Sequence, residues 1–252
     1  MMFTRSMAAV PEIARVTLRQ LLGRRRTVLL LLLAAVPVLM AVVYRAAGVN
    51  DVDSFAGAVL YGMSVTILLP IVAVLFGTAA FGAEIEDGTI VYLLAKPVSR
   101  WATILAKLVS TAGVTVLLSG ASVLLASAIA LIDTGEHGAE ATRAFLAAMI
   151  VGSVCYVALF LALSLFTRRA LLIGLVYVLV WEGALSSLLP GIANLSVRQY
   201  SLGVASSFVH MKSDMGSLAP DTALLLSVML VAVAVVLATW RLMRFELPGG
   251  SD

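Results

Sequence analysis

FGAEIEDGTIVYLLAKPVSRW, residues 81–101, is the most polar stretch of an otherwise apolar chain, and the long apolar runs on both sides of it decide the fold. A polar segment between two membrane spans must lie at a membrane surface. Asp87 is a suitable N-cap for a helix starting at Gly88, because its carboxylate can accept backbone N–H groups of the first turn. Pro97 lacks an N–H and disfavours helical geometry before it, so we expect this short helix to end there and Ser99 to cap the next helix.

The composition places the whole chain in a membrane. Of its 252 residues, 62% are hydrophobic and only 12% are charged, against about 25% charged residues in soluble domains. The mean hydropathy is +1.08. No polar stretch is long enough to fold separately, so we predict a single membrane domain over residues 1–252. The one cysteine, Cys155, lies in an apolar run, which excludes a disulfide framework.

The apolar runs predict an all-α membrane protein in which an amphipathic helix at the membrane interface, residues 1–26, precedes six transmembrane helices. The predicted spans are residues 27–44, 56–81, 100–132, 143–166, 170–189 and 223–240. The predicted connections are polar loops at 45–55 and 133–142, the polar segment 82–99, a partly helical outer segment at 190–222 and a polar tail at 241–252. Within 190–222, apolar residues recur at three- and four-residue steps, which predicts an amphipathic helix lying on the membrane surface.

The distribution of basic residues predicts the orientation. If the N-terminus is cytoplasmic, thirteen of the 17 lysines and arginines fall on the cytoplasmic side. The outer side then holds only Arg45, Arg143, Arg198 and Lys212. We therefore expect both termini and the polar segment 82–99 in the cytoplasm.

The sequence lacks the common catalytic motifs. It has neither a P-loop nor an H-E-x-x-H pair, and both of its histidines fall on the predicted outer side. Four residues of one polar loop could be imagined as metal ligands, but they lack a recognised ligand spacing: Asp133, Glu136, His137 and Glu140. We expect no catalytic residue, no metal site, no bound cofactor and no nucleic-acid partner.

The polar segment resembles the cytoplasmic coupling segment of the ABC-2 type permeases, the membrane subunits of ATP-binding cassette exporters. The resemblance lies in the order acid-x-acid-x-Gly-Thr, then a leucine, then Pro-x-Ser-Arg. The residues concerned, together with the neighbouring Asp87, are Glu84, Glu86, Gly88, Thr89, Leu93 (or Leu94), Pro97, Ser99 and Arg100. The alternative interpretation of this segment is a solvated cytoplasmic hairpin without a partner.

The resemblance implies a working assembly. The short helix would dock into a groove on a separate P-loop ATPase, present in two copies, which binds ATP and magnesium and drives export. A second permease chain, identical or closely homologous, would complete the complex in a bacterial or archaeal cell membrane. We expect Glu84 and Glu86 to lie in water, where alanine should lower the stability by about 1 kcal/mol or less.

The candidate substrate path consists of polar and aromatic residues inside predicted spans, suited to a hydrophobic or amphipathic cargo: Tyr61, Thr66, Tyr177, Trp181 and Glu182. Glu182 is the acid placed deepest, about 20 Å from Arg169 along a helix, and an acid at that depth usually faces protein or a water-filled cavity. It either holds the outer segment in place or serves the substrate path or an outer gate. The competing function classes are an ion-gradient-driven secondary transporter and a non-transporting membrane scaffold or unrecognised membrane enzyme.

Overall fold

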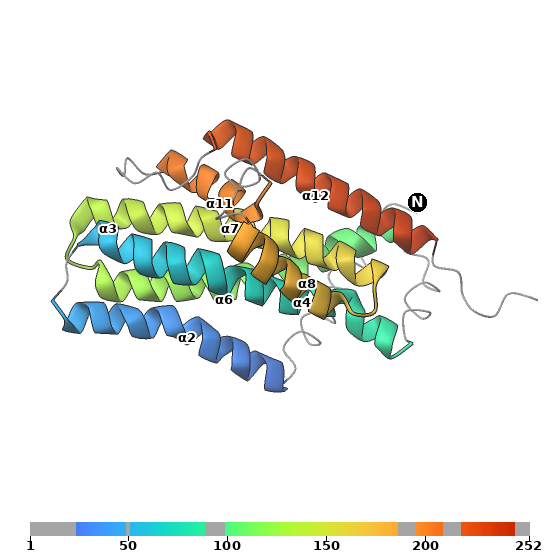
Figure 1. Ribbon diagram of the computed structural model, residues 1–252, viewed down its shortest axis with the longest axis horizontal. Helices are drawn as coiled ribbons and strands as arrows, with labels where there is room; N and C mark the ends of the chain where they lie inside the picture. The colour runs from blue at the N-terminus through green and yellow to red at the C-terminus, as the bar shows by residue number, and fades with distance from the viewer. Residues whose placement is uncertain (1–23, 49–50, 89–98, 186–194, 209–217, 245–252) are drawn as a thin grey trace, which may run out of the picture.

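The computed structural model describes residues 24–48, 51–88, 99–185, 195–208 and 218–244. The predicted interfacial helix lies outside these residues, apart from its last three positions. The described chain forms a bundle of long helices that run roughly side by side (Figure 1). In chain order the helices are α2 (Arg24–Ala46), α3 (Val52–Phe55), the π-helix η1 (Ala56–Leu68), α4 (Leu69–Glu86), α6 (Arg100–Ala130), α7 (Gly135–Phe166), α8 (Ala170–Val176), the π-helix η2 (Tyr177–Leu185), α11 (Val197–Ala205), the short 3₁₀ turn η3 (Ser206–Phe208) and α12 (Pro220–Met243).

Five helices in the described residues are long and apolar enough to cross a membrane, which makes the chain a multi-pass membrane protein. They are Thr27–Ala46, Val52–Gly82, Arg100–Ala130, Gly135–Phe166 and Pro220–Met243. The remaining predicted span, 170–189, is described as helix only through Leu185, and its apolar part at Ala170–Gly183 is shorter than the five.

Two regions predicted as polar loops are largely helical. The predicted loop at 133–142 is helical from Gly135 onwards, where α7 begins. The predicted loop at 45–55 is helical from Val52, and the Asp51 side chain caps that helix by accepting the Asp53 N–H. In both places polar residues occupy helical turns that extend beyond the apolar part of a span, so polarity marks the membrane boundary rather than the end of the helix.

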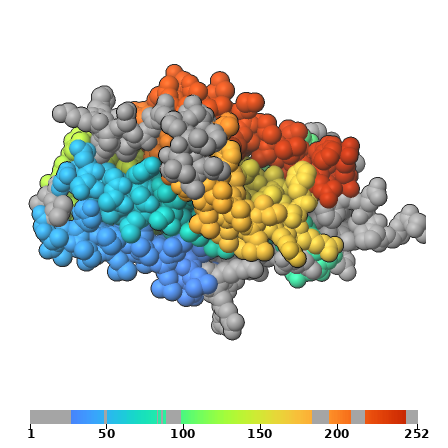
Figure 2. Space-filling model, viewed as in Figure 1, coloured from blue at the N-terminus to red at the C-terminus, as the bar shows by residue number. Residues whose placement is uncertain are grey.

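Small residues let α4, α7, α8 and α11 pack closely in the middle of the bundle. A Cβ added to Gly77 of α4 would lie 2.8 Å from Cβ of Phe160 on α7. A Cβ added to Gly152 of α7 would lie 2.6 Å from both a Leu69 methyl group of α4 and the Ser201 hydroxyl of α11. Close backbone approach through small residues is typical of helix packing in membranes. By contrast, α2 and α12 lie on opposite edges of the face shown in Figure 2 and carry many exposed apolar side chains.

The bundle has two chemically different ends. At one end, here called the basic end, the ends of α4, α7 and α12 meet the starts of α6 and α8, and it carries Arg100, Arg168, Arg169, Arg241 and Arg244 (Figure 1). The opposite end carries ion pairs within α7 and between the helix ends and turns that meet there. There Arg45 meets Asp133 at 2.5 Å, Arg143 meets Glu136 at 2.9 Å, and His137 lies 3.6 Å from Asp53. Three of the four residues considered as metal ligands thus contact a side chain that can carry the opposite charge: Asp133, Glu136 and His137.

The helix predicted for the outer segment exists, but its predicted position on the membrane surface is wrong. α11 packs between α7 and α12, and its residues Val197, Tyr200 and Leu202 are buried. Arg198 and Ser201 are buried too, so almost the whole circumference of the helix contacts protein. Val197 and Tyr200 of the predicted apolar stripe are buried, whereas Phe208 is half exposed. A second packing partner also covers the face that the sequence assigns to water.

Candidate functional site

The polar segment 82–99 begins as a continuation of α4, which runs through Glu86 rather than ending at residue 81. Gly88 adopts φ +68° and its N–H bonds to the Ile85 carbonyl, a left-handed glycine that terminates a helix. Asp87 and Gly88 therefore end α4 and are not the N-cap and first residue of the predicted short helix, whose remaining residues, 89–98, lie outside the described residues. Thr89, Leu93 and Pro97 lie outside the described residues, as does the side chain of Glu86.

The chain is described again at Ser99, whose side chain accepts the Ala102 N–H and caps α6. This cap was predicted from the sequence. The next residue, Arg100, donates from its guanidinium group to the Leu242 carbonyl in the last turn of α12. Arg241 in turn donates to the Leu165 carbonyl at the end of α7. Carbonyls at helix C-termini lack intrahelical partners and favour positive charge, so the two arginines tie α6, α12 and α7 together at the basic end.

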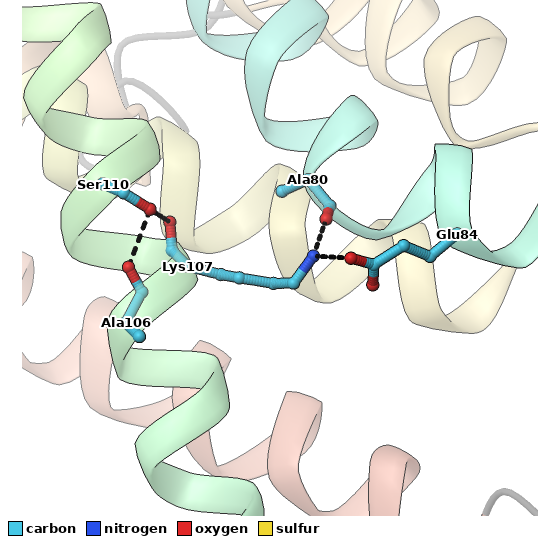
Figure 3. Close-up of polar contacts among 5 residues, drawn as sticks. All are labelled: Ala80, Glu84, Ala106, Lys107 and Ser110. Carbon is cyan, nitrogen blue, oxygen red and sulfur yellow. Dashed lines mark hydrogen bonds and ion pairs between the residues drawn. The ribbon is translucent and has the colours of Figure 1, made fainter. Parts of the chain in front are cut away.

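The most informative contact lies between α4 and α6, about two turns of α6 inward from the basic end. Lys107 Nζ is 2.7 Å from Glu84 Oε1, donates a second hydrogen bond to the Ala80 carbonyl, and lies 4.4 Å from the centre of the Phe81 ring (Figure 3). Lys107 is fully buried and Glu84 is 9% exposed. The expectation that Glu84 lies in water is therefore wrong.

This ion pair connects the two helices on either side of residues 89–98. Glu84 comes from the acid-x-acid motif at the end of α4, and Lys107 lies two turns into α6. An isolated charge is costly to bury, and removing one partner of a buried pair leaves the other uncompensated. The pair therefore joins the end of α4 to the start of α6 through a contact that is costly to break.

A second polar cluster lies deeper in the bundle, where η2 meets the start of α11. Glu182 is buried, and its carboxylate accepts hydrogen bonds from the Val197 N–H at 3.0 Å, the Ser196 hydroxyl and the Tyr177 hydroxyl at 3.3 Å. The α11 N-terminus thus receives from η2 the acceptor that its own cap residue does not supply. Glu182 anchors α11 within the bundle.

The other candidate substrate-path residues lie around this anchor. Trp181 stacks on Tyr177 with ring centres 6.4 Å apart, and Tyr177 meets Phe160 of α7 edge-on. Tyr61 of η1 lies under the Arg198 guanidinium, 6.0 Å from ring centre to Cζ. The structure therefore brings Tyr61, Tyr177, Trp181 and Glu182 to the two sides of one short helix.

Thr66 has a more local role. Its hydroxyl donates to the Tyr61 carbonyl five residues earlier, at 3.1 Å. Ser64 makes the same kind of bond to Val59. Both bonds follow the five-residue step of a π-helix, a rare conformation that is frequent at functional sites. One residue of each π-helix contacts α11: Tyr61 of η1 lies against Arg198, and Glu182 of η2 accepts the Val197 N–H.

Two residues of these clusters were not selected from the sequence. Lys107 was counted only as one more cytoplasmic basic residue, and Arg198 only as an outer one. The available signal was position, because a lysine seven residues into a 31-residue apolar helix is expected to have a partner. Pairing it with Glu84 requires knowing that α4 continues to Glu86.

These features define the class of protein: a multi-pass helical membrane protein with a buried charge pair at the base of two helices and a short polar-anchored helix inside the bundle. The sequence model of the ABC-2 family transporter proteins matches residues 11–247, and the chain belongs to this family. Members of the family work together with ATP-binding subunits. No curated protein matches the chain in sequence.

Proposed function

We propose that this chain is the membrane-spanning subunit of an ATP-driven exporter, moved by a separate ATPase that binds ATP and magnesium. Membership of the ABC-2 family and the acid-x-acid-x-Gly-Thr motif support this proposal. The single observation that carries it is the Glu84–Lys107 pair, because it joins the motif directly to the following helix. A hairpin that is merely solvated has no need of a buried charge pair at its base.

The coupling residues divide into two groups with different tasks. The residues of the first group would contact the ATPase: Glu86, Asp87, Gly88, Thr89, Leu93, Pro97 and Arg100. Glu84 and Lys107 make the ends of α4 and α6 move as one unit. Since α4 packs along α7, and α7 carries α11, motion at the basic end reaches the Glu182 cluster.

We further propose six membrane crossings with the basic end in the cytoplasm. α8 begins at the basic end and α12 begins at the opposite end, so the chain crosses once between them (Figure 1). Together with the five long helices this would make an even number of crossings, which supports cytoplasmic termini, in agreement with the distribution of basic residues. The cell would be bacterial or archaeal.

The cargo that suits this bundle is hydrophobic or amphipathic. The path would pass the aromatic and polar residues around α11, with Tyr61, Thr66, Tyr177 and Trp181 along it and Glu182 holding α11. Export rather than import follows from the resemblance to the exporters alone.

The test is to express the chain with its ATPase subunit, reconstitute the complex, and compare ATP hydrolysis with that of the ATPase alone. The double variant Glu84→Gln/Lys107→Met removes the pair without leaving an uncompensated charge, so the complex should still assemble while the permease-dependent stimulation falls at least about tenfold. Ser110→Ala is the matched control, because the Ser110 hydroxyl bonds only to carbonyls of its own helix, at Ala106 and Lys107 (Figure 3). Full stimulation in an assembled complex of the double variant would reject the coupling role of the pair.

An ion-gradient-driven transporter is the second candidate, favoured by one specific observation. Two buried acids, Glu84 and Glu182, lie within the helical bundle, and such groups often serve proton or ion relays. The two functions separate in inside-out vesicles supplied with an amphipathic fluorescent dye. An exporter accumulates the dye with ATP and the ATPase subunit whether or not an ionophore is present, whereas a gradient-driven transporter stops when the ionophore is added.

A further inference from the structure

A cavity of about 250 Å³ lies at the basic end between the end of α4, the α7–α8 turn and the start of α8. Its rim carries Arg168 and Arg169, and its walls are formed by small and apolar residues: Ala79, Gly82, Ile85, Ala170, Leu171 and Leu172. Thr78, Ser164 and Thr167 complete the lining, which contains no carboxylate. The cavity is therefore positive at its mouth and apolar along its sides.

The two arginines differ from the other arginines whose side chains the structure describes. Arg45 and Arg143 form ion pairs with acids, and Arg100 and Arg241 donate hydrogen bonds to backbone carbonyls. Arg244 stacks on Trp240 and Arg198 faces Tyr61. Among the described residues, no acceptor contacts the guanidinium group of Arg168 or of Arg169. Two adjacent, exposed cations at the edge of a cavity, without an acceptor among the described residues, are available to bind an anion.

We propose that this cavity binds a phosphate-bearing anion, held by Arg168 and Arg169, and that its natural source is the headgroup of an anionic phospholipid. Guanidinium groups match phosphate oxygens in geometry and charge. Basic pockets between membrane helices on the cytoplasmic side bind such headgroups.

The surroundings of the cavity favour a lipid over a free ion. Next to it, Leu172 and Ile173 expose their side chains on the outer surface of α8, where acyl chains run alongside a membrane helix. A diacyl lipid would thus place its phosphate at the arginines and its glycerol against Gly82 and Leu171. A bound headgroup would also connect α4, which leads into the polar segment, with α8, which leads to Glu182.

The experiment measures lipid binding to the full chain in detergent by native mass spectrometry. The probes are phosphatidylglycerol, phosphatidylcholine and inorganic phosphate. We expect the wild type to bind one phosphatidylglycerol tightly. The Arg168→Gln/Arg169→Gln variant should bind it at least about tenfold more weakly, because each arginine near an anionic headgroup adds to the binding free energy. Arg244→Gln, a charge removed from the same end of the bundle, should leave the affinity unchanged.

A second variant tests the cavity without altering charge. A Cβ at Gly82 meets no atom within 4 Å, so Gly82→Leu fits the backbone and fills the cavity. It should weaken phosphatidylglycerol binding as strongly as the double arginine variant. If inorganic phosphate competes with phosphatidylglycerol at equal concentration, the site binds phosphate but its natural ligand is a free ion. If only phosphatidylglycerol binds, the natural ligand is the lipid.

Two outcomes would overturn the proposal. One is equal phosphatidylglycerol affinity in the wild type, the double arginine variant and Gly82→Leu. The other is loss of ATPase copurification in the double variant with unchanged lipid binding, which would assign the arginines to a protein contact.

Discussion

Glu84 and Lys107 show how a single charged residue can be accommodated inside a membrane helix bundle. The ammonium group has three donors, and the carboxylate of Glu84 and the carbonyl of Ala80 accept two of them. The Phe81 ring adds a favourable aromatic face at 4.4 Å. The pair is therefore well satisfied on the lysine side, and the energetic consequence of a substitution depends on which partner is removed.

Glu84→Ala should be strongly destabilising, by about 3 kcal/mol or more, because it leaves the buried Lys107 ammonium without its counter-charge. The double variant Glu84→Gln/Lys107→Met should recover most of that loss, since no uncompensated charge remains. Thermal unfolding followed by size-exclusion chromatography of the detergent-solubilised protein measures both. Equal stability of Glu84→Ala and the wild type would restore the earlier expectation that Glu84 lies in water.

Glu182 is expected to act through α11 rather than through its charge. Glu182→Gln keeps an acceptor oxygen for the Val197 N–H, and its amide NH2 can donate to the Ser196 hydroxyl, which turns from donor to acceptor, so the variant should fold and transport normally. Glu182→Ala removes both acceptors and should lower the stability by about 1–3 kcal/mol. Expression and thermal unfolding, together with dye transport, separate the two. A well-folded Glu182→Gln protein without transport would instead place the charge in the substrate path or the outer gate.

At the scale of single residues, burial is predicted poorly when it is inferred from the polarity of the neighbouring residues in the sequence. Glu84 was assigned to water because its neighbours are polar, although burial depends on which face of α4 meets α6. Glu182, in contrast, could be singled out because an acid in an apolar helix is unfavourable wherever it points. Its partners Ser196 and Val197 are 14 and 15 residues away, across a connection whose path no local pattern encodes.

At the scale of helices, close packing depends on where glycines lie relative to a neighbour. Gly77 of α4 faces Phe160, and any Cβ there would lie at 2.8 Å from that side chain. Gly113 of α6 is also inside a long helix, but a Cβ there meets nothing within 4 Å. The same substitution at these two positions should therefore have opposite effects.

Gly77→Ala should destabilise the bundle by about 1–3 kcal/mol, because α4 and α7 must separate to admit the methyl group. Gly113→Ala is the matched control and should be neutral or slightly stabilising, since alanine is favoured over glycine in a helix. The midpoint of thermal unfolding measures both variants. Identical shifts in the two proteins would show that helix propensity, not packing, dominates at Gly77.

The sequence predicts the long helices well and their ends poorly. Apolar length locates α2, α6 and α12 to within a few residues, because the bilayer imposes it. The start of α7 was placed eight residues too late, since its first two turns are polar yet helical. The membrane surface position of α11 was wrong because its partners, α7 and α12, lie far away in the sequence.

At the scale of the whole molecule, the chain carries one segment that resembles a coupling segment, residues 82–99. An ATP-binding cassette sandwiches ATP between two copies, so a complex with one such segment per chain needs two permease chains. We expect two permease chains and two ATPase chains per active complex. Native mass spectrometry of the purified complex measures this directly, and one permease chain per pair of ATPases would contradict it.

The position of α11 between α7 and α12 has a consequence for how the protein is made. α7 leaves the ribosome well before α11, and α12 leaves it afterwards, so α11 has only one of its two packing surfaces when it first enters the membrane. Until α12 arrives, the buried arginine of α11 and the carboxylate that holds its first turn are accessible to the insertion machinery and to quality-control proteases. Packing of α12 therefore closes the bundle around α11, and a delay at α12 should mark the chain for degradation.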